Sequence, residues 1–363
     1  HGYRATVIAP VPWFPVTSSL FPVYSQYANI PAIEERCGIT IYHPRYLVIP
    51  SIGMLFAPLS LAFSVFLMAR RLQRRGMSWD LIDAHYYYPD GVAAALVARM
   101  LGKPLTITAR GSDINVISQF NLPRRMMLWA AKQAARTIAV SDALRRAMVQ
   151  MGIAPEEISV LRNGVDLEQF RPLPKTVLKA RYRIGPCAIL TIGNLVELKG
   201  HDLVIRALTE LPDCELLVVG GGELLADLEQ LAADLQVTGR VHFLGVVAQQ
   251  QLSEIYGAVD LVVLASRHEG MPNVVLEAMA CDTPVVATAV GGVPEIVSAP
   301  EAGVLVQERS VEGLTAGIRK LLETYPVEGS TRAYAERFSW DDTIRDLSAL
   351  FVEIVNRQAQ EPV

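Results

Sequence analysis

Short runs of aliphatic and β-branched residues alternate with longer segments of helical periodicity along most of the chain. The runs that predict strands are 5–9, 81–84, 105–108, 137–140, 158–161, 188–192, 215–219, 241–244, 261–264, 284–287 and 303–306. Apolar strands separated by segments of helical length indicate parallel sheets whose two faces are both covered by helices. We therefore expect an α/β protein with two doubly wound sheets.

The alternation is interrupted at NGVDLEQFRPLPK, residues 163–175, where a turn dipeptide and two prolines occur. A chain of 363 residues suits two domains better than one. We predict a first domain over 1–165 and a second over 166–338. The last amphipathic pattern, in 339–363, predicts a helix with no strand after it.

Composition excludes some classes of protein. At 51% hydrophobic and 19% charged residues, the chain has the balance of a folded protein and not of a disordered one. Its four cysteines lie far apart in the sequence, so the spacing indicates neither a zinc site nor a disulfide framework. This usage fits a reducing cytosol.

The charge is distributed unevenly. Residues 1–165 carry 17 Lys and Arg against 9 Asp and Glu, a net charge of +8, whereas residues 166–363 carry 16 against 28, a net charge of −12. A basic first half indicates an anionic partner. Because the chain has no ribonucleoprotein motif, zinc-finger spacing or lysine run, we expect this partner to be anionic lipid or phosphate and not nucleic acid.

The segment 47–69 has no charged residue and is followed by four arginines within six positions. Its length would suffice to span a bilayer, but two prolines and several serines interrupt it. We expect a helix from about Leu59 to Arg75. Two alternatives stay open for it, a helix resting on an anionic inner leaflet and a buried helix with a solvated basic end.

The stretch RHEGMPNVVLEAMA, residues 267–280, follows the strand predicted at 261–264 and opens a helix. Loops at the carboxyl ends of parallel strands bind ligands, and a helix N-terminus favours an anion such as phosphate. Like charges repel, so Glu269 should contact a neutral hydroxyl beside that anion, and sugar hydroxyls would satisfy the charge of Glu277. The alternative is that Glu277 pairs with a structural arginine and Glu269 is solvated.

A second strand, loop and helix lies in CAILTIGNLVELKGHDLVIRAL, where Gly193 and Gly200 bracket Lys199. A lysine at a helix N-terminus is unfavourable unless it serves a bound anion. The glycines at 220–222 resemble a dinucleotide fingerprint only weakly, because Leu225 stands where its third glycine belongs. The chain also has no phosphate-loop motif and no Asp-x-Asp pair, so we expect neither an NAD cofactor nor a metal.

These motifs resemble the family 4 retaining glycosyltransferases of the GT-B fold. The resemblance lies in RHEGMPNVVLEAMACDTPVVATAVGGVPEIV, the Glu-x7-Glu signature, and continues in NGVDLEQFRP, TIGNLVELKG, VVGGGEL, VHFLG and AVSDALRRAM. The phrases DAHYYYPDG and TARGSDIN are similar to members that build bacterial exopolysaccharide or teichuronic-acid-type polymers. The resemblance therefore covers nearly the whole chain.

The resemblance assigns roles to individual residues. It implies that Glu269 binds donor-sugar hydroxyls, Glu277 binds the ribose and Lys199 binds the diphosphate. Three further groups would contact the donor: the loop of Gly193 and Asn194, the base-contacting backbone at Gly245 and Val246, and the backbone of Gly270, Met271, Pro272 and Asn273. No metal or other cofactor is implied, because the lysine and helix dipoles neutralise the leaving diphosphate.

The chain departs from the family pattern at two places. Asn194 stands where many members have an arginine, which removes a permanent charge from the diphosphate clamp. Arg110 stands where many members have a sugar-contacting histidine, and it either assists catalysis or forms a salt bridge with Asp113. Asp113, in the same motif, is expected to bind substrate. The opening HGYRATVIAP resembles the second strand of the fold, so the first strand and helix of the first domain are expected to be absent.

The implied activity is transfer of a sugar, with retention of configuration, from a nucleotide diphosphate donor to a glycan or lipid-linked acceptor. UDP is the expected nucleotide, and the expected location is cytoplasmic, peripheral on the inner face of the membrane. The family also implies that the last helix crosses back to the first domain and that closure of the cleft gates turnover. A nucleotide-sugar epimerase of the same fold and a noncatalytic nucleotide-sugar-binding module are the alternatives.

Overall fold

The structure is a computed structural model that describes residues 3–13, 27, 29–48 and 53–360. The chain divides into two compact units: His1–Ala139, Arg145–Ser159 and Ala349–Val363 form the first, and Val140–Leu144 and Val160–Ser348 form the second. After β9 the second unit begins at Val160, a few residues before the predicted start at 166. The intervening residues contact the second unit: Asn163 bonds to Asn273, and Val165 bridges to Ser339.

The second unit contains a six-stranded sheet whose strand pairings are all parallel, with the order β12-β11-β10-β13-β14-β15. Its strands are β10 (Cys187–Ile192), β11 (Cys214–Val219), β12 (Val241–Gly245), β13 (Leu261–Leu264), β14 (Val285–Thr288) and β15 (Gly303–Val306). Each predicted strand is present with its ends within one residue. Because the strand order reverses between β10 and β13, the carboxyl ends of these two strands form the position where such sheets bind ligands.

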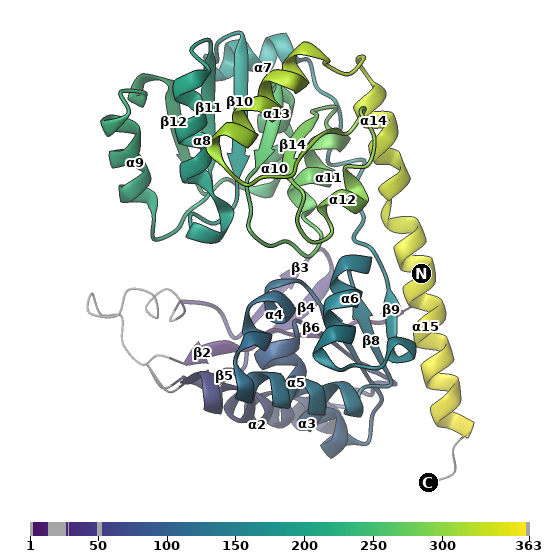
Figure 1. The fold of residues 1–363 in the computed structure, drawn as a ribbon. Coiled ribbons are helices and arrows are strands. Elements are labelled where there is room, and N and C mark those ends of the chain that lie inside the picture. Colours follow the sequence, from purple (N-terminus) through teal and green to yellow (C-terminus); the bar gives the residue numbers. More distant parts are fainter. Residues whose placement is uncertain (1–2, 14–26, 28, 49–52, 361–363) are drawn as a thin grey trace. The chain divides into compact units, whose positions relative to one another are not determined.

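Helices cover both faces of this sheet (Figure 1). The helices of this unit are α7 (Lys175–Tyr182), α8 (His201–Ala207), α9 (Leu225–Asp234), α10 (Gln249–Ala258), α11 (Asn273–Ala280), α12 (Val293–Ile296), α13 (Val311–Glu323), α14 (Ser330–Ala335) and the first part of α15 (Trp340–Gln360), whose remainder from Ala349 belongs to the first unit. Leu216 and Val263 face α8, α9 and α13 in one core cluster, whereas Leu190 and Val262 are fully buried outside that cluster. Both faces are therefore apolar, which explains why the strands appear in the sequence as continuous hydrophobic runs.

The first unit has a four-stranded sheet, β6-β7-β8-β9, and shorter pairings before it. The strands are β1 (Val7–Ile8), β2 (Val11–Trp13), β3 (Ile33–Arg36), β4 (Ile39–Tyr42), β5 (Arg45–Leu47), β6 (Ile82–His85), β7 (Leu105–Ala109), β8 (Arg136–Ala139) and β9 (Ile158–Val160). The helices are α2 (Gly53–Arg74), α3 (Val92–Leu101), α4 (Ser112–Asn115), α5 (Asn121–Gln133) and α6 (Asp142–Met151). The sequence did not predict β2 to β5, because strands of three or four partly exposed residues leave little periodic signal.

Helix α2 differs from the prediction at its start. It begins at Gly53, six residues before the expected Leu59, and Pro58 lies inside it. The proline removes one backbone hydrogen bond, but packing of Leu61 and Ala62 against α3 supports the surrounding turns. In the part of the chain that the structure describes, no helix has the length and apolarity needed to cross a membrane.

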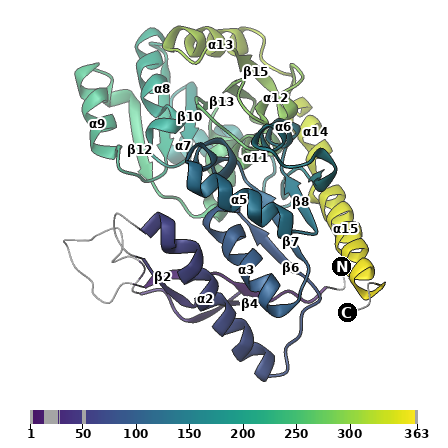
Figure 2. The ribbon, with the colours of Figure 1, turned by 60° about the horizontal axis from the view of Figure 1, so that its bottom comes forward.

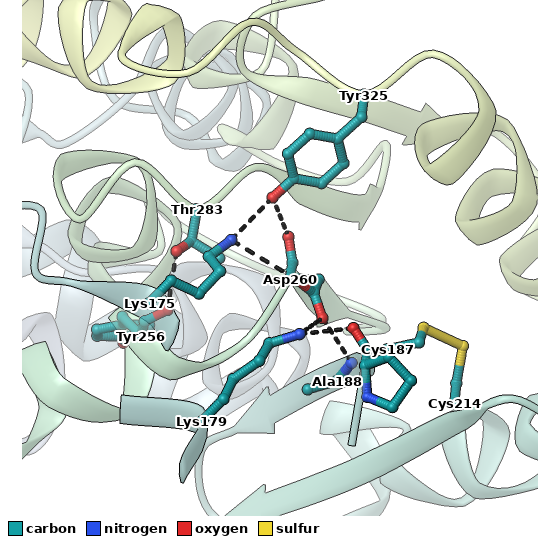
Figure 3. Close-up of polar contacts among 10 residues, drawn as sticks. Lys175, Lys179, Cys187, Ala188, Cys214, Tyr256, Asp260, Thr283 and Tyr325 are labelled. Carbon is teal, nitrogen blue, oxygen red and sulfur yellow. Dashed lines mark hydrogen bonds and ion pairs between the residues drawn. A yellow bond between two sulfur atoms is a disulfide. The ribbon is translucent and has the colours of Figure 1, made fainter. Parts of the chain in front are cut away.

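The expectation of unpaired cysteines is wrong for Cys187 and Cys214, which form a disulfide (Figure 3). They are the first residues of β10 and β11 and lie opposite each other in register, with Cα atoms 4.6 Å apart. A spacing of 27 residues carries no disulfide signature, because the strand–helix–strand connection alone makes the two positions neighbours.

Beside the disulfide, Asp260 connects the amino ends of β10 and β13 (Figure 3). Its Oδ2 accepts hydrogen bonds from Lys179 Nζ at 2.5 Å and from the backbone N–H of Ala188 at 2.7 Å. The Tyr325 hydroxyl donates to the Asp260 carbonyl at 2.7 Å. This network supports the end of the sheet opposite the loops described next.

Candidate active site

The candidate active site of the second unit is built on the loops that follow β10 and β13, at the point where the strand order reverses. Lys199 ends the short 3₁₀ helix η4 (Glu197–Lys199), and Glu269 lies in the loop between β13 and α11. Lys199 Nζ donates to Glu269 Oε1 at 2.6 Å. The Glu269 side chain is only 10% exposed and that of Lys199 is 28% exposed. The structure therefore brings together two predicted residues that lie 70 positions apart in the sequence.

Several contacts fix the two loops relative to each other. The backbone N–H of Arg267 donates to the Leu198 carbonyl at 2.8 Å, and the guanidinium of Arg267 pairs with Glu197 at 2.9 Å. Arg309 Nε donates to the Ala265 carbonyl at 2.8 Å. No sequence motif pointed to Arg309, because this residue belongs to a separate segment far from both loops.

Close backbone approach also explains two glycines. Gly200 has φ +68°, and a Cβ there would lie 2.4 Å from the Ala265 carbonyl oxygen. A Cβ on Gly291 would lie 1.8 Å from the carbonyl oxygen of Glu269. Only glycine permits such contacts, so the backbone that carries Glu269 is confined from two sides.

The loop after Glu269 presents backbone donors at the start of α11. The helix begins at Asn273 with Pro272 as its N-cap. Within the described residues, the N–H groups of Gly270, Met271 and Asn273 donate to no acceptor. Free N–H groups at a helix N-terminus, together with the positive end of its dipole, favour an anion.

Glu277 lies on α11 among buried apolar residues. Its Oε2 accepts a hydrogen bond of 2.9 Å from the hydroxyl of Tyr256, a fully buried side chain of α10. Burial raises the pKa of Glu277 above its usual value, and the hydrogen bond from Tyr256 partly opposes that shift. The alternative of a structural arginine for Glu277 is wrong, because its partner is Tyr256. A solvated Glu269 is also wrong, because that side chain is only 10% exposed and pairs with Lys199.

The loops after β10, β11 and β12 pack closely. The Gly193 N–H donates to the Val219 carbonyl at 3.0 Å, and the Gly220 N–H donates to the Gly245 carbonyl at 2.8 Å. A Cβ on Gly220 would lie 1.9 Å from the carbonyl oxygen of Gly193. Val246, directly after β12, is 84% exposed. Gly193, Gly245 and Val246 therefore lie at the carboxyl end of the sheet, on the loops that the sequence selected.

His201 orders the loop that carries Asn194. Its Nδ1 lies 3.0 Å from Thr191 Oγ1, and its Nε2 lies 3.2 Å from the Asn194 carbonyl. Since a carbonyl only accepts, Nε2 carries the proton and Nδ1 accepts from the threonine. Burial lowers the pKa of His201, which keeps the ring neutral in this arrangement. The Asn194 side chain itself is exposed.

In the first unit, Asp113 organises a loop. It is fully buried, and its carboxylate accepts the backbone N–H groups of Tyr87, Arg110, Gly111 and Ile114. A carboxylate occupied by four backbone donors has little capacity left for a substrate hydroxyl. The structure therefore gives Asp113 a supporting position and not the substrate-facing one expected from the sequence.

Arg110 is held by a chain of polar side chains. Its guanidinium donates to His85 Nδ1 at 2.8 Å, and His85 Nε2 lies 3.2 Å from Asp83 Oδ2. Thr106 Oγ1 donates to the other oxygen of Asp83 at 2.6 Å. Because Nδ1 must accept from the guanidinium, the proton of a neutral His85 is on Nε2, facing the carboxylate. This arrangement orients Arg110, and the sequence did not single out His85 for it.

Among the described residues, no group of three or more His, Cys, Asp or Glu side chains converges as metal ligands do. The free cysteines are Cys37, which is exposed, and Cys281, which is buried. The independence from metal that the sequence indicates stays a prediction.

Comparison with known proteins places this site in a family. Residues 20–169 match the family model Glycosyltransferase Family 4, and residues 181–338 match the model Glycosyl transferases group 1. The chain is 30% identical to D-inositol 3-phosphate glycosyltransferase 1 of Catenulispora acidiphila, a match that covers 96% of this chain and 90% of that protein. The chain belongs to the family 4 glycosyltransferases.

Two further comparisons bear on this glycosyltransferase. It is 31% identical to the putative teichuronic acid biosynthesis glycosyltransferase TuaC of Bacillus subtilis, over 88% of this chain and 80% of that protein. The crystal structure of Anabaena Alr3699/HepE in complex with UDP and glucose matches with a TM-score of 0.74 and 25% identity, covering 86% of each chain. The GT-B fold expected from the sequence is confirmed.

Proposed function

We propose that this glycosyltransferase moves a sugar, with retention of configuration, from a UDP-sugar to a glycan or lipid-linked acceptor in bacterial polysaccharide synthesis. The observation that carries the proposal is the Lys199–Glu269 pair beside the free N–H groups of α11. An ammonium group and backbone donors suit a diphosphate, and an adjacent carboxylate suits sugar hydroxyls. The UDP and glucose of the similar Anabaena structure support a donor of this class.

Each group has a role in the proposed complex. The Lys199 ammonium and the N–H groups of Gly270, Met271 and Asn273 bind the diphosphate, while Glu269 accepts hydrogen bonds from hydroxyls of the donor sugar. Glu277 accepts hydrogen bonds from the ribose, with Tyr256 fixing its orientation. The backbone at Gly245 and the exposed side chain of Val246 contact the base.

The proposed reaction breaks the bond between the anomeric carbon and the phosphate oxygen. The acceptor hydroxyl attacks the same face of that carbon, and a phosphate oxygen of the leaving UDP takes the acceptor proton. Lys199 and the start of α11 stabilise the charge that develops on the diphosphate. This scheme uses neither a protein nucleophile nor a metal.

The names of the relatives support two classes of acceptor. One relative is named for teichuronic acid biosynthesis and another for transfer to D-inositol 3-phosphate. We favour the polymer class, since the basic, apolar helix α2 suits an acceptor that is presented at a membrane. The corresponding location is cytoplasmic, peripheral on the inner face of the membrane.

A UDP-release assay tests the proposal. The protein is incubated with a panel of UDP- and GDP-sugars, with and without bacterial membrane extract, in the presence and absence of EDTA. We expect UDP release that requires the extract, persists in EDTA and is lost in Lys199→Met, and NMR of the product should show the donor's anomeric configuration. Inverted product, a strict metal requirement, or interconversion of the donor sugar without acceptor would each overturn it.

A further inference from the structure

Helix α2 has a second apolar face that no residue described by the structure covers. Its buried side includes Leu61, Ala62 and Leu72, and the first two pack against α3. Another set of large apolar residues is more than half exposed: Phe56, Leu59, Phe63 and Leu67. Spacings of three, four and four residues place this set along one side of the helix. We call these four residues the exposed stripe.

The apolar surface continues beyond the helix. Trp13 and Leu47 pair in register across β2 and β5, and they are 47% and 60% exposed. A groove of about 350 Å³ is lined by residues of β5 and α2, and its walls include Leu47, Phe63, Leu67 and Met68. Figure 2 shows α2 along the outer side of the first unit. Contiguous apolar surface of this kind on a folded unit marks an interaction site.

The end of the same helix is strongly basic. Arg70, Arg71, Arg74 and Arg75 are all exposed. Arg71, Arg74 and Arg75 form no ion pair with any residue that the structure describes. In the sequence, residues 36–79 contain six arginines and no aspartate or glutamate. The surface therefore has an uncompensated positive charge directly beside its apolar stripe.

We propose that this face docks on an anionic phospholipid bilayer, with the exposed stripe in the acyl region and the four arginines at the headgroup phosphates. Apolar side chains beside a cationic end are the combination that binds such a surface. A second copy of the chain is a poorer occupant, because the same segment contains no acidic residue to neutralise the arginines. The inference rests on the proposed membrane location and is independent of the donor and of the transfer reaction.

Flotation with vesicles tests the surface directly. The full chain is mixed with vesicles of phosphatidylcholine alone or with 30% phosphatidylglycerol, without nucleotide. We expect binding to the anionic vesicles only. The variant with Arg70, Arg71, Arg74 and Arg75 changed to Gln should bind about 600-fold more weakly, because each basic residue near the surface strengthens binding about fivefold. Phe63→Ser with Leu67→Ser should weaken binding at least about tenfold.

Matched variants separate local from general effects. Changing the exposed Arg99, Arg125, Arg146 and Arg183 to Gln removes the same charge elsewhere, and Val177→Ser with Val327→Ser removes exposed apolar residues elsewhere. Both controls should float like the parent protein, and all variants should bind UDP equally. If the charge control lost as much vesicle binding as the variant of the four α2 arginines, the docking surface would be refuted. The docking surface would also be refuted if the parent protein bound no vesicles and instead self-associated in light scattering, with the self-association lost in the stripe variant.

Discussion

The pairing of Lys199 with Glu269 predicts that charge at this position controls nucleotide affinity. Replacing Lys199 by Met removes the ammonium group that lies 2.6 Å from Glu269 Oε1. The carboxylate is then left without its partner in a position where it is only 10% exposed. UDP therefore loses its attraction to the ammonium group and is also repelled by the unpaired Glu269 carboxylate. The single substitution should have a larger effect on UDP affinity than the loss of one contact.

The magnitude follows from the distances. Two unit charges about 4 Å apart interact by about 4 kcal/mol at an effective dielectric constant of about 20. Since the lysine is 28% exposed, solvent screening reduces this, and we expect about 2 to 3 kcal/mol. Lys199→Met should thus raise the Kd for UDP between about 30-fold and 150-fold. Glu269→Gln should lower the Kd several-fold, because it removes the repulsion and leaves the ammonium available to phosphate.

Titration calorimetry with UDP on Lys199→Met, Glu269→Gln and the double variant measures these effects. Lys320→Met, on the exposed side of α13, is the matched control and should bind UDP normally. The double variant should bind more tightly than Lys199→Met, with a coupling of at least about 1 kcal/mol. If Glu269→Gln weakens UDP binding as much as Lys199→Met does, or if the two effects add without coupling, the electrostatic reasoning is wrong.

Three further predictions concern stability. Burial raises the pKa of Glu277 in the native state. At pH values between the usual glutamate pKa and this raised pKa, the native state binds more protons than the unfolded state, so stability falls as pH rises. Glu277→Gln should remove this pH dependence, measured by thermal unfolding. Gly220→Ala should cost at least about 2 kcal/mol, since its φ is +140° and its Cβ would meet a carbonyl oxygen at 1.9 Å, whereas Gly239→Ala, with open space around it, should be nearly neutral in urea unfolding. Reduction of the Cys187–Cys214 disulfide should lower stability by up to about 3.5 kcal/mol, and a variant with both cysteines replaced by Ala should be insensitive to reductant.

The strands of the second unit were predictable because helices cover both faces of its sheet. A strand such as β13 is buried along its whole length, so it appears in the sequence as an uninterrupted apolar run. Lys199 and Glu269 were also predictable, as residues that follow such runs. Their ion pair was not, because it depends on β10 and β13 being neighbours, a property of the strand order and not of either segment.

Residues that act through distant contacts escaped the sequence analysis. Tyr256 fixes Glu277 from another helix, and Arg309 holds the loop of β13 from a segment about 40 residues later. Asp113 illustrates the opposite error: its position in a conspicuous motif suggested a ligand contact, but its carboxylate is occupied by backbone donors. The side chain's hydrogen-bond partners decide such cases, and local sequence does not specify them.

Asn194 offers a final test of how this site distributes its positive charge. The residue lies two positions after the end of β10, and its side chain is exposed. Its carbonyl is held by His201, so the backbone is fixed independently of the side chain. Asn194→Arg adds a charge that solvent partly screens, and it should tighten UDP binding about threefold to tenfold at low salt. The gain should shrink in 0.5 M salt, and Asn194→Gln should change nothing, since it adds length without charge. A gain that persists in high salt, or appears equally in the Gln variant, would mean that contact geometry and not charge limits this loop.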